Sequence, residues 1–109
     1  MMRKTISLVI ALGFVVSSVG AAGAAKAART GKQVYESACI ACHGTGAAGA
    51  PKFGDKVWLE LEKKEGLKEL VKDAIKGERA MPPKGGCTDC TDDEIRNAVT
   101  YMIDAAKKK

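Results

Sequence analysis

The sequence predicts a small all-α protein, and three features support this fold class. Apolar residues recur at helical spacing, most clearly at Ile95, Ala98, Val99, Met102 and Ile103, which follow the i, i+3, i+4, i+7 and i+8 pattern of one helix face. Two loops rich in glycine and proline separate the periodic segments. No segment of useful length alternates apolar and polar residues, so no strand is expected.

Residues 30–42 are predicted to form the first of about four helices. Thr30 is a suitable N-cap, and apolar residues recur through the segment at helical spacing. Residues 44–54 follow with four glycines and Pro51. The chain is therefore expected to loop there before the second helix.

Two short helices and one long helix are predicted for the rest of the chain. Asp55 is the expected cap of the second helix, which ends at Gly66, and Gly77 stops the third. Prolines and glycines in residues 78–90 exclude regular helix. Residues 91–94 form a capping box with acidic residues in the first turn, and this box opens the last helix.

The most specific motif is Cys39-Ile40-Ala41-Cys42-His43, at the end of the first predicted helix. C-x-x-C-H is the attachment signature of a c-type haem. Each thiol forms a thioether with one vinyl group of the macrocycle, and the adjacent histidine is the proximal ligand of the iron. The motif therefore predicts one covalently bound haem c, attached at Cys39 and Cys42 and ligated by His43.

A second C-x-x-C pair, Cys87 and Cys90, makes a zinc site the first alternative. The 44 residues between Cys42 and Cys87 exceed the roughly 15–20 of a zinc ribbon, and His43 would be a fifth candidate ligand for a four-coordinate ion. A thioredoxin-like dithiol at Cys39 would need βαβ surroundings, whereas the local sequence predicts helix. Haem is therefore favoured over both.

Residues 1–25 have the composition of a secretory signal peptide, which leaves residues 26–109 as one domain. Arg3 and Lys4 precede a mostly apolar run of 14 residues, shorter than the roughly 20 that cross a bilayer, and small residues follow. Cleavage is expected near Ala25. An uncleaved anchor is the alternative. Because covalent haem attachment of this kind resembles bacterial periplasmic maturation, we expect an exported, periplasmic protein, soluble or loosely membrane-associated.

An oxidising compartment also bears on the second cysteine pair. Export favours a disulfide between Cys87 and Cys90, with a redox-active dithiol as the alternative. Thr91 stands where a second haem motif would need histidine. Without Arg3 and Lys4 the chain has 16 basic and 13 acidic residues, too small an excess to suggest nucleic acid as a partner.

The second axial position has one candidate that no helical pattern explains. Two of the four methionines lie in the predicted leader, and Met102 falls on the apolar face of the last helix, which favours a core role. Met81 lies in a loop, where Pro82 and Pro83 restrict the backbone. Lysines, or no protein ligand at all, are the other possibilities.

The order of these motifs resembles that of a class I cytochrome c. The segments Gly49-Ala50-Pro51-Lys52-Phe53-Gly54-Asp55 and Met81-Pro82-Pro83-Lys84-Gly85-Gly86-Cys87, followed by Cys90, are similar to the cytochrome c5 group. The resemblance covers essentially the whole mature chain.

This resemblance implies a small cytochrome c fold around one haem, with His43 and Met81 as axial ligands. It also implies that the carbonyl of Pro51 accepts a hydrogen bond from the ring of His43. The resemblance further implies that the first and last helices cross, with Gly31 and Tyr35 near the start and Tyr101 near the end. On sequence alone, Tyr35 and Tyr101 are equally well explained as generic core aromatics.

Trp58, the only tryptophan, follows the cap of the second predicted helix. It is expected to pack against the haem, with its indole N–H directed to a propionate. A simple core tryptophan fits the sequence equally well.

With both axial positions filled, the iron has no open site, and outer-sphere electron transfer is the chemistry that remains. The sequence therefore predicts a diffusible one-electron carrier, not an enzyme, with no small-molecule substrate. Lys52, Lys56 and Lys84 are expected near an exposed haem edge, where their combined positive charge would steer the carrier toward acidic docking surfaces. Taken individually, each is better explained as an ordinary solvated lysine.

The resemblance implies a membrane-bound reductase as electron donor and a terminal oxidase or similar complex as acceptor. A haem-based enzyme or gas sensor, with an open or displaceable sixth ligand, is the alternative function. A structural zinc module is a further alternative.

Overall fold

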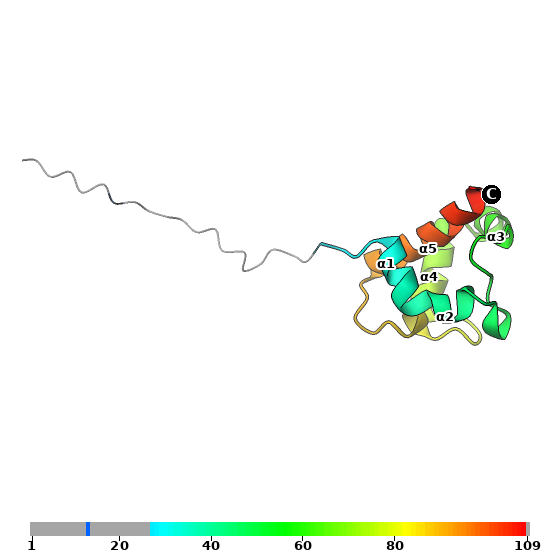
Figure 1. The fold of residues 1–109 in the computed structure, drawn as a ribbon, viewed down its shortest axis with the longest axis horizontal. Coiled ribbons are helices and arrows are strands. Elements are labelled where there is room, and N and C mark those ends of the chain that lie inside the picture. Colours follow the sequence, from blue (N-terminus) through cyan, green and yellow to red (C-terminus); the bar gives the residue numbers. More distant parts are fainter. Residues whose placement is uncertain (1–12, 14–26, 109) are drawn as a thin grey trace, which may run out of the picture.

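The computed structural model describes residue 13 and residues 27–108, so the signal peptide predicted for residues 1–25 lies outside the described residues. The described chain folds into helices joined by loops (Figure 1). In residues 27–108 the one β-type pairing is an isolated bridge between Glu78 and Met81. The predicted all-α fold is therefore confirmed. Within the same range, no helix combines the length and the apolar character that crossing a membrane requires.

The first helical segment runs without interruption through three elements, which are α1 (Gly31–Val34), the π-helical turn η1 (Tyr35–Cys39) and α2 (Ile40–His43). Thr30 caps it as predicted. Gln33 N donates to Thr30 Oγ1 at 3.2 Å, and Thr30 N donates to Gln33 Oε1 at 2.9 Å. The helix extends to His43, one residue beyond the prediction, and carries the whole C-x-x-C-H motif in its last two turns.

Two helices follow the glycine-rich loop, in which residues 47–49 form the short 3₁₀ turn η2 (Ala47–Gly49). The first is α3 (Val57–Glu65) and the second is α4 (Leu67–Lys76). Gly66 and Gly77 end them with φ of 85° and 89°, as the sequence indicates. The predicted Asp55 cap is wrong by one residue. Lys56 is the N-cap, and the Asp55 carboxylate accepts from Val57 N at 3.2 Å in the turn before it.

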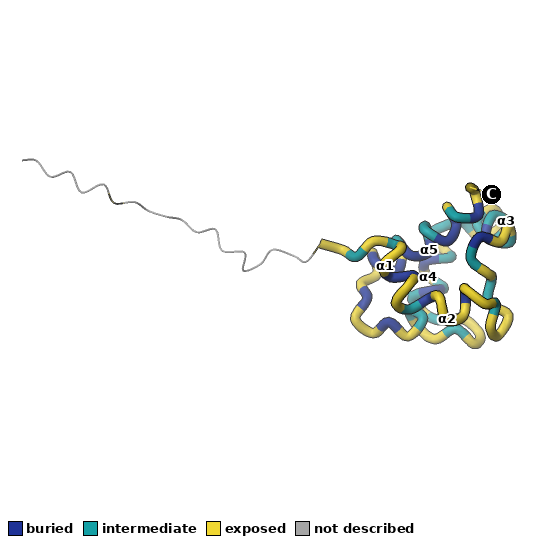
Figure 2. Tube along the Cα trace, viewed as in Figure 1, coloured by how far each residue is buried: buried dark blue, intermediate teal, exposed yellow. Residues whose placement is uncertain are grey.

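The last helix is α5 (Asp92–Lys107), and it follows a loop that contains the 3₁₀ turn η3 (Pro83–Gly86). Thr91 caps α5 with the predicted capping box, since Glu94 N donates to Thr91 Oγ1 at 3.1 Å and Thr91 N donates to Glu94 Oε1 at 2.9 Å. Figure 2 shows the buried residues where α1 and α4 each pack against α5. The predicted apolar face of α5 is buried, with Ile95, Ala98, Val99, Met102 and Ile103 each at most 3% exposed.

Helices α1 and α5 cross in close contact at Gly31. A methyl group at Gly31 would collide with the backbone carbonyl of Asn97 and would lie 2.7 Å from Tyr101 Cβ. Nearby, the rings of Tyr35 and Tyr101 are 5.5 Å apart, and that of Phe53 lies 4.7 Å from Tyr35 and 5.3 Å from Tyr101. The crossing implied by Gly31, Tyr35 and Tyr101 is therefore present, and an aromatic cluster fills its edge.

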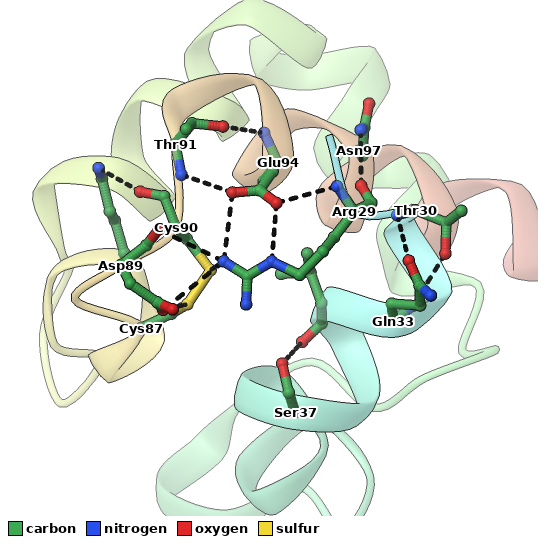
Figure 3. Close-up of polar contacts among 12 residues, drawn as sticks. Arg29, Thr30, Gln33, Ser37, Cys87, Asp89, Cys90, Thr91, Glu94 and Asn97 are labelled. Atoms are coloured by element: carbon green, nitrogen blue, oxygen red, sulfur yellow. Dashed lines mark hydrogen bonds and ion pairs between the residues drawn. A yellow bond between two sulfur atoms is a disulfide. The ribbon is translucent and has the colours of Figure 1, made fainter. Parts of the chain in front are cut away.

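An ion pair holds the start of α1 against the start of α5 (Figure 3). Arg29 Nε donates to Glu94 Oε2 at 2.7 Å, Arg29 Nη2 donates to Oε1 at 3.2 Å, and the backbone N–H of Arg29 adds a third contact to Oε2 at 2.9 Å. The Arg29 guanidinium, with the backbone N–H groups of Thr91 and Arg29, holds the pKa of the buried Glu94 carboxyl far below its usual range. Asn97 Nδ2 also donates to the carbonyl of Arg29 at 3.1 Å.

We predict that Gly31→Ala destabilises the protein. Alanine favours a helix over glycine by about 1 kcal/mol, but the colliding atoms are backbone and Cβ atoms of α5, which cannot swing aside. Overpacking of this kind costs typically about 1–3 kcal/mol, so the net effect is a lower melting temperature in circular dichroism. Lys32→Ala, at an exposed position of the same helix, is the control. Equal stability of the two variants would mean that the crossing tolerates a side chain.

We also predict that Glu94→Gln lowers the melting temperature at pH 7 by several degrees. Because the folded state lowers the pKa of Glu94, the unfolded chain binds the proton more readily, and the stabilisation is present at neutral pH. It is lost as the pH falls below about 4, the ordinary range of a glutamate pKa. The difference between the two proteins should therefore shrink in acid. Asp93→Asn, at an exposed acid in the same turn, should show no such convergence.

Candidate haem site

The C-x-x-C-H motif lies where the π-helical turn η1 passes into α2. Ile40 N donates to Tyr35 O, five residues back, so this turn contains one residue more than an α-helical turn. Cys39 and His43 are 8% and 7% exposed, whereas Cys42 is exposed to solvent. Burial raises the pKa of the Cys39 thiol to about 11. Neither Cys39 nor Cys42 is in a disulfide, so both sulfurs are available for covalent attachment.

The ring of His43 is fixed by the loop that follows it. His43 Nδ1 lies 2.8 Å from the carbonyl oxygen of Pro51, the pairing that the resemblance implies. A carbonyl oxygen only accepts, so Nδ1 carries the hydrogen, and in the neutral imidazole Nε2 keeps its lone pair. Phe53 N also donates to His43 O at 2.6 Å, which ties the same loop to the motif. The imidazole is therefore oriented by a second group, as metal-ligating histidines are.

Trp58 lies beside this histidine. The ring centroids of His43 and Trp58 are 5.4 Å apart, and the indole ring is buried. Its N–H donates to the carbonyl of Lys52 at 3.0 Å. The acceptor is thus a backbone group of the loop that also carries Pro51, whereas the sequence suggested a propionate. These contacts describe a core tryptophan behind the histidine, and contact with the haem stays a prediction.

Met81 and Met102 occupy different environments, as the sequence suggests. Met102 is 3% exposed in the core on α5, which confirms its core role. Met81 lies in the loop before η3, half-buried, and its N–H and C=O are both paired with Glu78, at 2.9 and 3.0 Å. A methyl group built on Gly85 would lie 3.9 Å from Met81 Cε and 3.6 Å from the carbonyl of Ala38. The Met81 side chain therefore lies near the turn that delivers Cys39.

The second cysteine pair is bonded in the structure. Cys87 and Cys90 form a disulfide with a Cα–Cα distance of 5.4 Å, and both are buried. Arg29 Nη2 lies 3.4 Å from Cys90 Sγ, so the bond is adjacent to the Arg29–Glu94 ion pair (Figure 3). Within the described residues, Cys87, Asp89 and Cys90 are the one group with metal-ligating spacing. With both sulfurs bonded to each other, this group offers no thiolates for zinc.

Sequence reasoning missed three contacts that shape the site. Arg29 and Glu94 are 65 residues apart, and no local pattern links them. The acceptor of the Trp58 indole is a main-chain atom, which no side-chain motif reveals. Lys84, expected as a docking lysine, instead donates from Nζ to the carbonyl of Cys90 at 2.7 Å and pairs with Asp92 at 3.3 Å.

The residues present fit a covalently bound haem. Two thiols outside any disulfide and one imidazole with an unused Nε2 follow one another on a single helix, and this is the donor set that c-type haem attachment uses. A thioether side chain lies in the neighbouring loop. The geometry by itself identifies a haem site without specifying the subgroup of protein.

Comparison with known proteins supplies the subgroup. The family model described as cytochrome c oxidase, cbb3-type, subunit III matches residues 26–102. Cytochrome c5 of Ectopseudomonas mendocina is 46% identical over 84 residues, which cover 75% of this chain and 97% of that protein. Cytochrome c5 of Azotobacter vinelandii is 47% identical over 77 residues, covering 69% and 93%. Cytochrome c-555 of Chlorobaculum tepidum is 42% identical over 84 residues, covering 73% and 78%.

A solved structure agrees with these relatives. A chain in the crystal structure of an electron transfer complex of nitrite reductase with cytochrome c has a TM-score of 0.65 and 45% sequence identity. The match covers 70% of this chain and 93% of that chain. The similarity to the two cytochromes c5 extends over nearly all of their own length. The chain therefore belongs to the class I c-type cytochromes, in the cytochrome c5 group, and carries a covalently bound haem c.

Proposed function

We propose that this protein is a soluble periplasmic one-electron carrier in which Cys39 and Cys42 hold the haem and His43 and Met81 ligate its iron. The observation that supports this most directly is the 2.8 Å contact between His43 Nδ1 and the Pro51 carbonyl. It leaves only Nε2 free to bind a metal. Residues 1–25 would be the signal peptide that directs export, and residues 26–109 the mature domain.

The bound haem supplies a one-electron couple between Fe(III) and Fe(II). Around it, the chain's own residues orient the ligands. The Pro51 carbonyl holds the His43 ring and increases its basicity as a ligand. As a ligand of the iron, the Met81 thioether would favour the reduced state relative to a second nitrogen donor and so would raise the potential. With both ligands in place there is no open position for a substrate, so electron carriage is the function and the protein is not an enzyme.

The surface beside the attachment motif is suited to contact with another protein. Ile40, between the two cysteines, is 46% exposed, and Cys42 is exposed next to it. Lys52 and Lys56 are exposed, as a docking role requires, but Lys84 is engaged with Cys90 and Asp92. Since a relative of known structure is a cytochrome c in complex with nitrite reductase, we infer redox proteins as partners. Membrane-bound respiratory complexes, a reductase as donor and a terminal oxidase as acceptor, are the pair that we propose.

The first prediction of this proposal concerns the sixth ligand. Met81→Ala should open the distal position, so the near-infrared thioether–iron band of the ferric protein disappears, the potential falls and the ferrous protein binds carbon monoxide. Met102→Leu is the matched control. It conserves volume in the core and should cost less than about 1.5 kcal/mol of stability, with the band and potential unchanged.

The same spectra separate the carrier from a haem enzyme or gas sensor. A carrier with two protein ligands should bind carbon monoxide weakly in its native form. Ready binding to the wild-type ferrous protein, with no thioether–iron band in the ferric state, would favour a sensor or enzyme. Survival of the band in Met81→Ala would show that another residue is the ligand.

A further prediction concerns the disulfide. Replacing both Cys87 and Cys90 by serine should lower the free energy of unfolding by about 2 kcal/mol, because the bond closes a loop directly before the α5 cap. The haem spectrum and one-electron potential should stay nearly constant. A redox titration decides between this and the dithiol alternative. A two-electron component coupled to haem reduction, absent from the double variant, would mean that the cysteines are a second redox centre.

A further inference from the structure

Three consecutive residues of the loop after Met81 have left-handed backbone conformations. The φ angles of Lys84, Gly85 and Gly86 are 56°, 61° and 86°. Glycine adopts this conformation without steric penalty, but a lysine does not, because its Cβ approaches its own carbonyl oxygen. A non-glycine residue persists there only when its surroundings hold it in place. The contacts of Lys84 identify what holds it.

The side chain of Lys84 reaches back to the start of α5. Its Nζ donates to the carbonyl of Cys90 at 2.7 Å and lies 3.3 Å from Asp92 Oδ1. The side chain is only 27% exposed, whereas that of Asp92 is 72% exposed. The Lys84 carbonyl also accepts from Cys87 N at 3.0 Å. Lys84 therefore joins the turn after Met81 to the beginning of the last helix, through both its main chain and its ammonium group.

The contacts of Lys84 with the start of α5, called here the Lys84 anchor, are linked to Met81 through the turn at Gly85. Gly85 N donates to the carbonyl of Pro82 at 2.9 Å, which closes the turn directly after Met81. A methyl group built on Gly85 would come within 3.9 Å of Met81 Cε and 3.6 Å of the Ala38 carbonyl, so this turn lies close to both. On its other side, Met81 is paired with Glu78. The Met81 segment is thus held by a backbone bridge at one end and by the Lys84 anchor at the other.

We propose that Lys84 is a positioning residue for Met81. The ammonium group of Lys84 ties the methionine loop to the start of α5 and so would hold the Met81 thioether in place as the iron ligand. This inference rests on the proposed function, because it takes Met81 as the sixth ligand. It assigns Lys84 an intramolecular role, so Lys84 is not one of the lysines that we propose to contact a partner protein. The left-handed conformation follows from this role, since it directs the side chain toward Cys90 and Asp92.

The test compares four variants of the haem-loaded protein. Lys84→Gly removes the ammonium and suits the left-handed backbone, so any effect is not due to strain. Lys84→Arg keeps the charge and is the conservative rescue. Asp92→Asn removes one of the two partners. Lys68→Ala, an exposed lysine on α4, is the control for loss of a positive charge. Circular dichroism and the haem absorption maximum first establish that each variant is folded.

The readouts are the ferric thioether–iron band and the affinity of the ferrous protein for carbon monoxide. For Lys84→Gly we expect a weaker band and carbon monoxide affinity raised about tenfold, the lower end of the range for loss of one hydrogen bond to a charged group. Asp92→Asn should give a smaller change in the same direction. Lys84→Arg should retain most of the band, and Lys68→Ala all of it.

Failure of this inference and failure of the proposed ligand set give different results. If the wild type lacks the band, or Met81→Ala keeps it, the ligand assignment fails and the role of Lys84 with it. If Met81→Ala loses the band while Lys84→Gly keeps the wild-type band and carbon monoxide affinity, only the positioning role is overturned. An effect of Lys84→Gly confined to electron exchange with a protein partner would likewise overturn it. Loss of the band in Lys84→Arg as complete as in Lys84→Gly would show that the charge does not hold the loop.

Discussion

The close crossing of α1 over α5 is the constraint on which the rest of the structure depends. Gly31 allows the two backbones to touch, and Arg29 fixes their approach by donating to Glu94, which also belongs to the capping box of α5. The attachment motif continues from α1, and the Met81 loop ends at the cap of α5. A shift at the crossing would therefore move the attachment motif and the Met81 loop relative to each other. Three features therefore act on the same crossing, which are the missing side chain at Gly31, the Arg29–Glu94 ion pair and the α5 capping box.

Most of the fold could be predicted because the signals that define it are local. The capping boxes at Thr30 and Thr91, and the ends at Gly66 and Gly77, each depend on residues within one helical turn. The start of α3 was predicted one residue too early. The Asp55 carboxylate accepts a hydrogen bond in the turn just before the helix, and Lys56 is the N-cap. The π-helical turn η1 had no signal, because apolar spacing does not distinguish a hydrogen bond to the fifth residue back from one to the fourth.

In the candidate site, too, the local features could be predicted from the sequence and the non-local contacts could not. The motif at residues 39–43 is contiguous, so its chemistry follows from the sequence, and family resemblance supplied the expected Pro51 contact that the structure contains. The contacts of Arg29 and Lys84 could not be predicted. Arg29 meets Glu94 across 65 residues. Lys84 lies close to Asp92 in sequence, but its side chain reaches Asp92 from a left-handed backbone, which Pro-Lys-Gly-Gly predicts for the glycines and not for the lysine.

The two loops that carry the proposed ligand contacts are each closed by backbone hydrogen bonds. On one side Phe53 N returns to the carbonyl of His43, and on the other Met81 pairs with Glu78 in both directions. A one-electron carrier changes its charge without changing its bonds, so a site that does not rearrange between oxidation states responds fastest. A sensor or enzyme has the opposite requirement, because one loop must open to admit a ligand. Closure of each loop on itself, with the second also tied to α5 through Lys84, favours the carrier, since each proposed ligand is carried by a compact hydrogen-bonded unit.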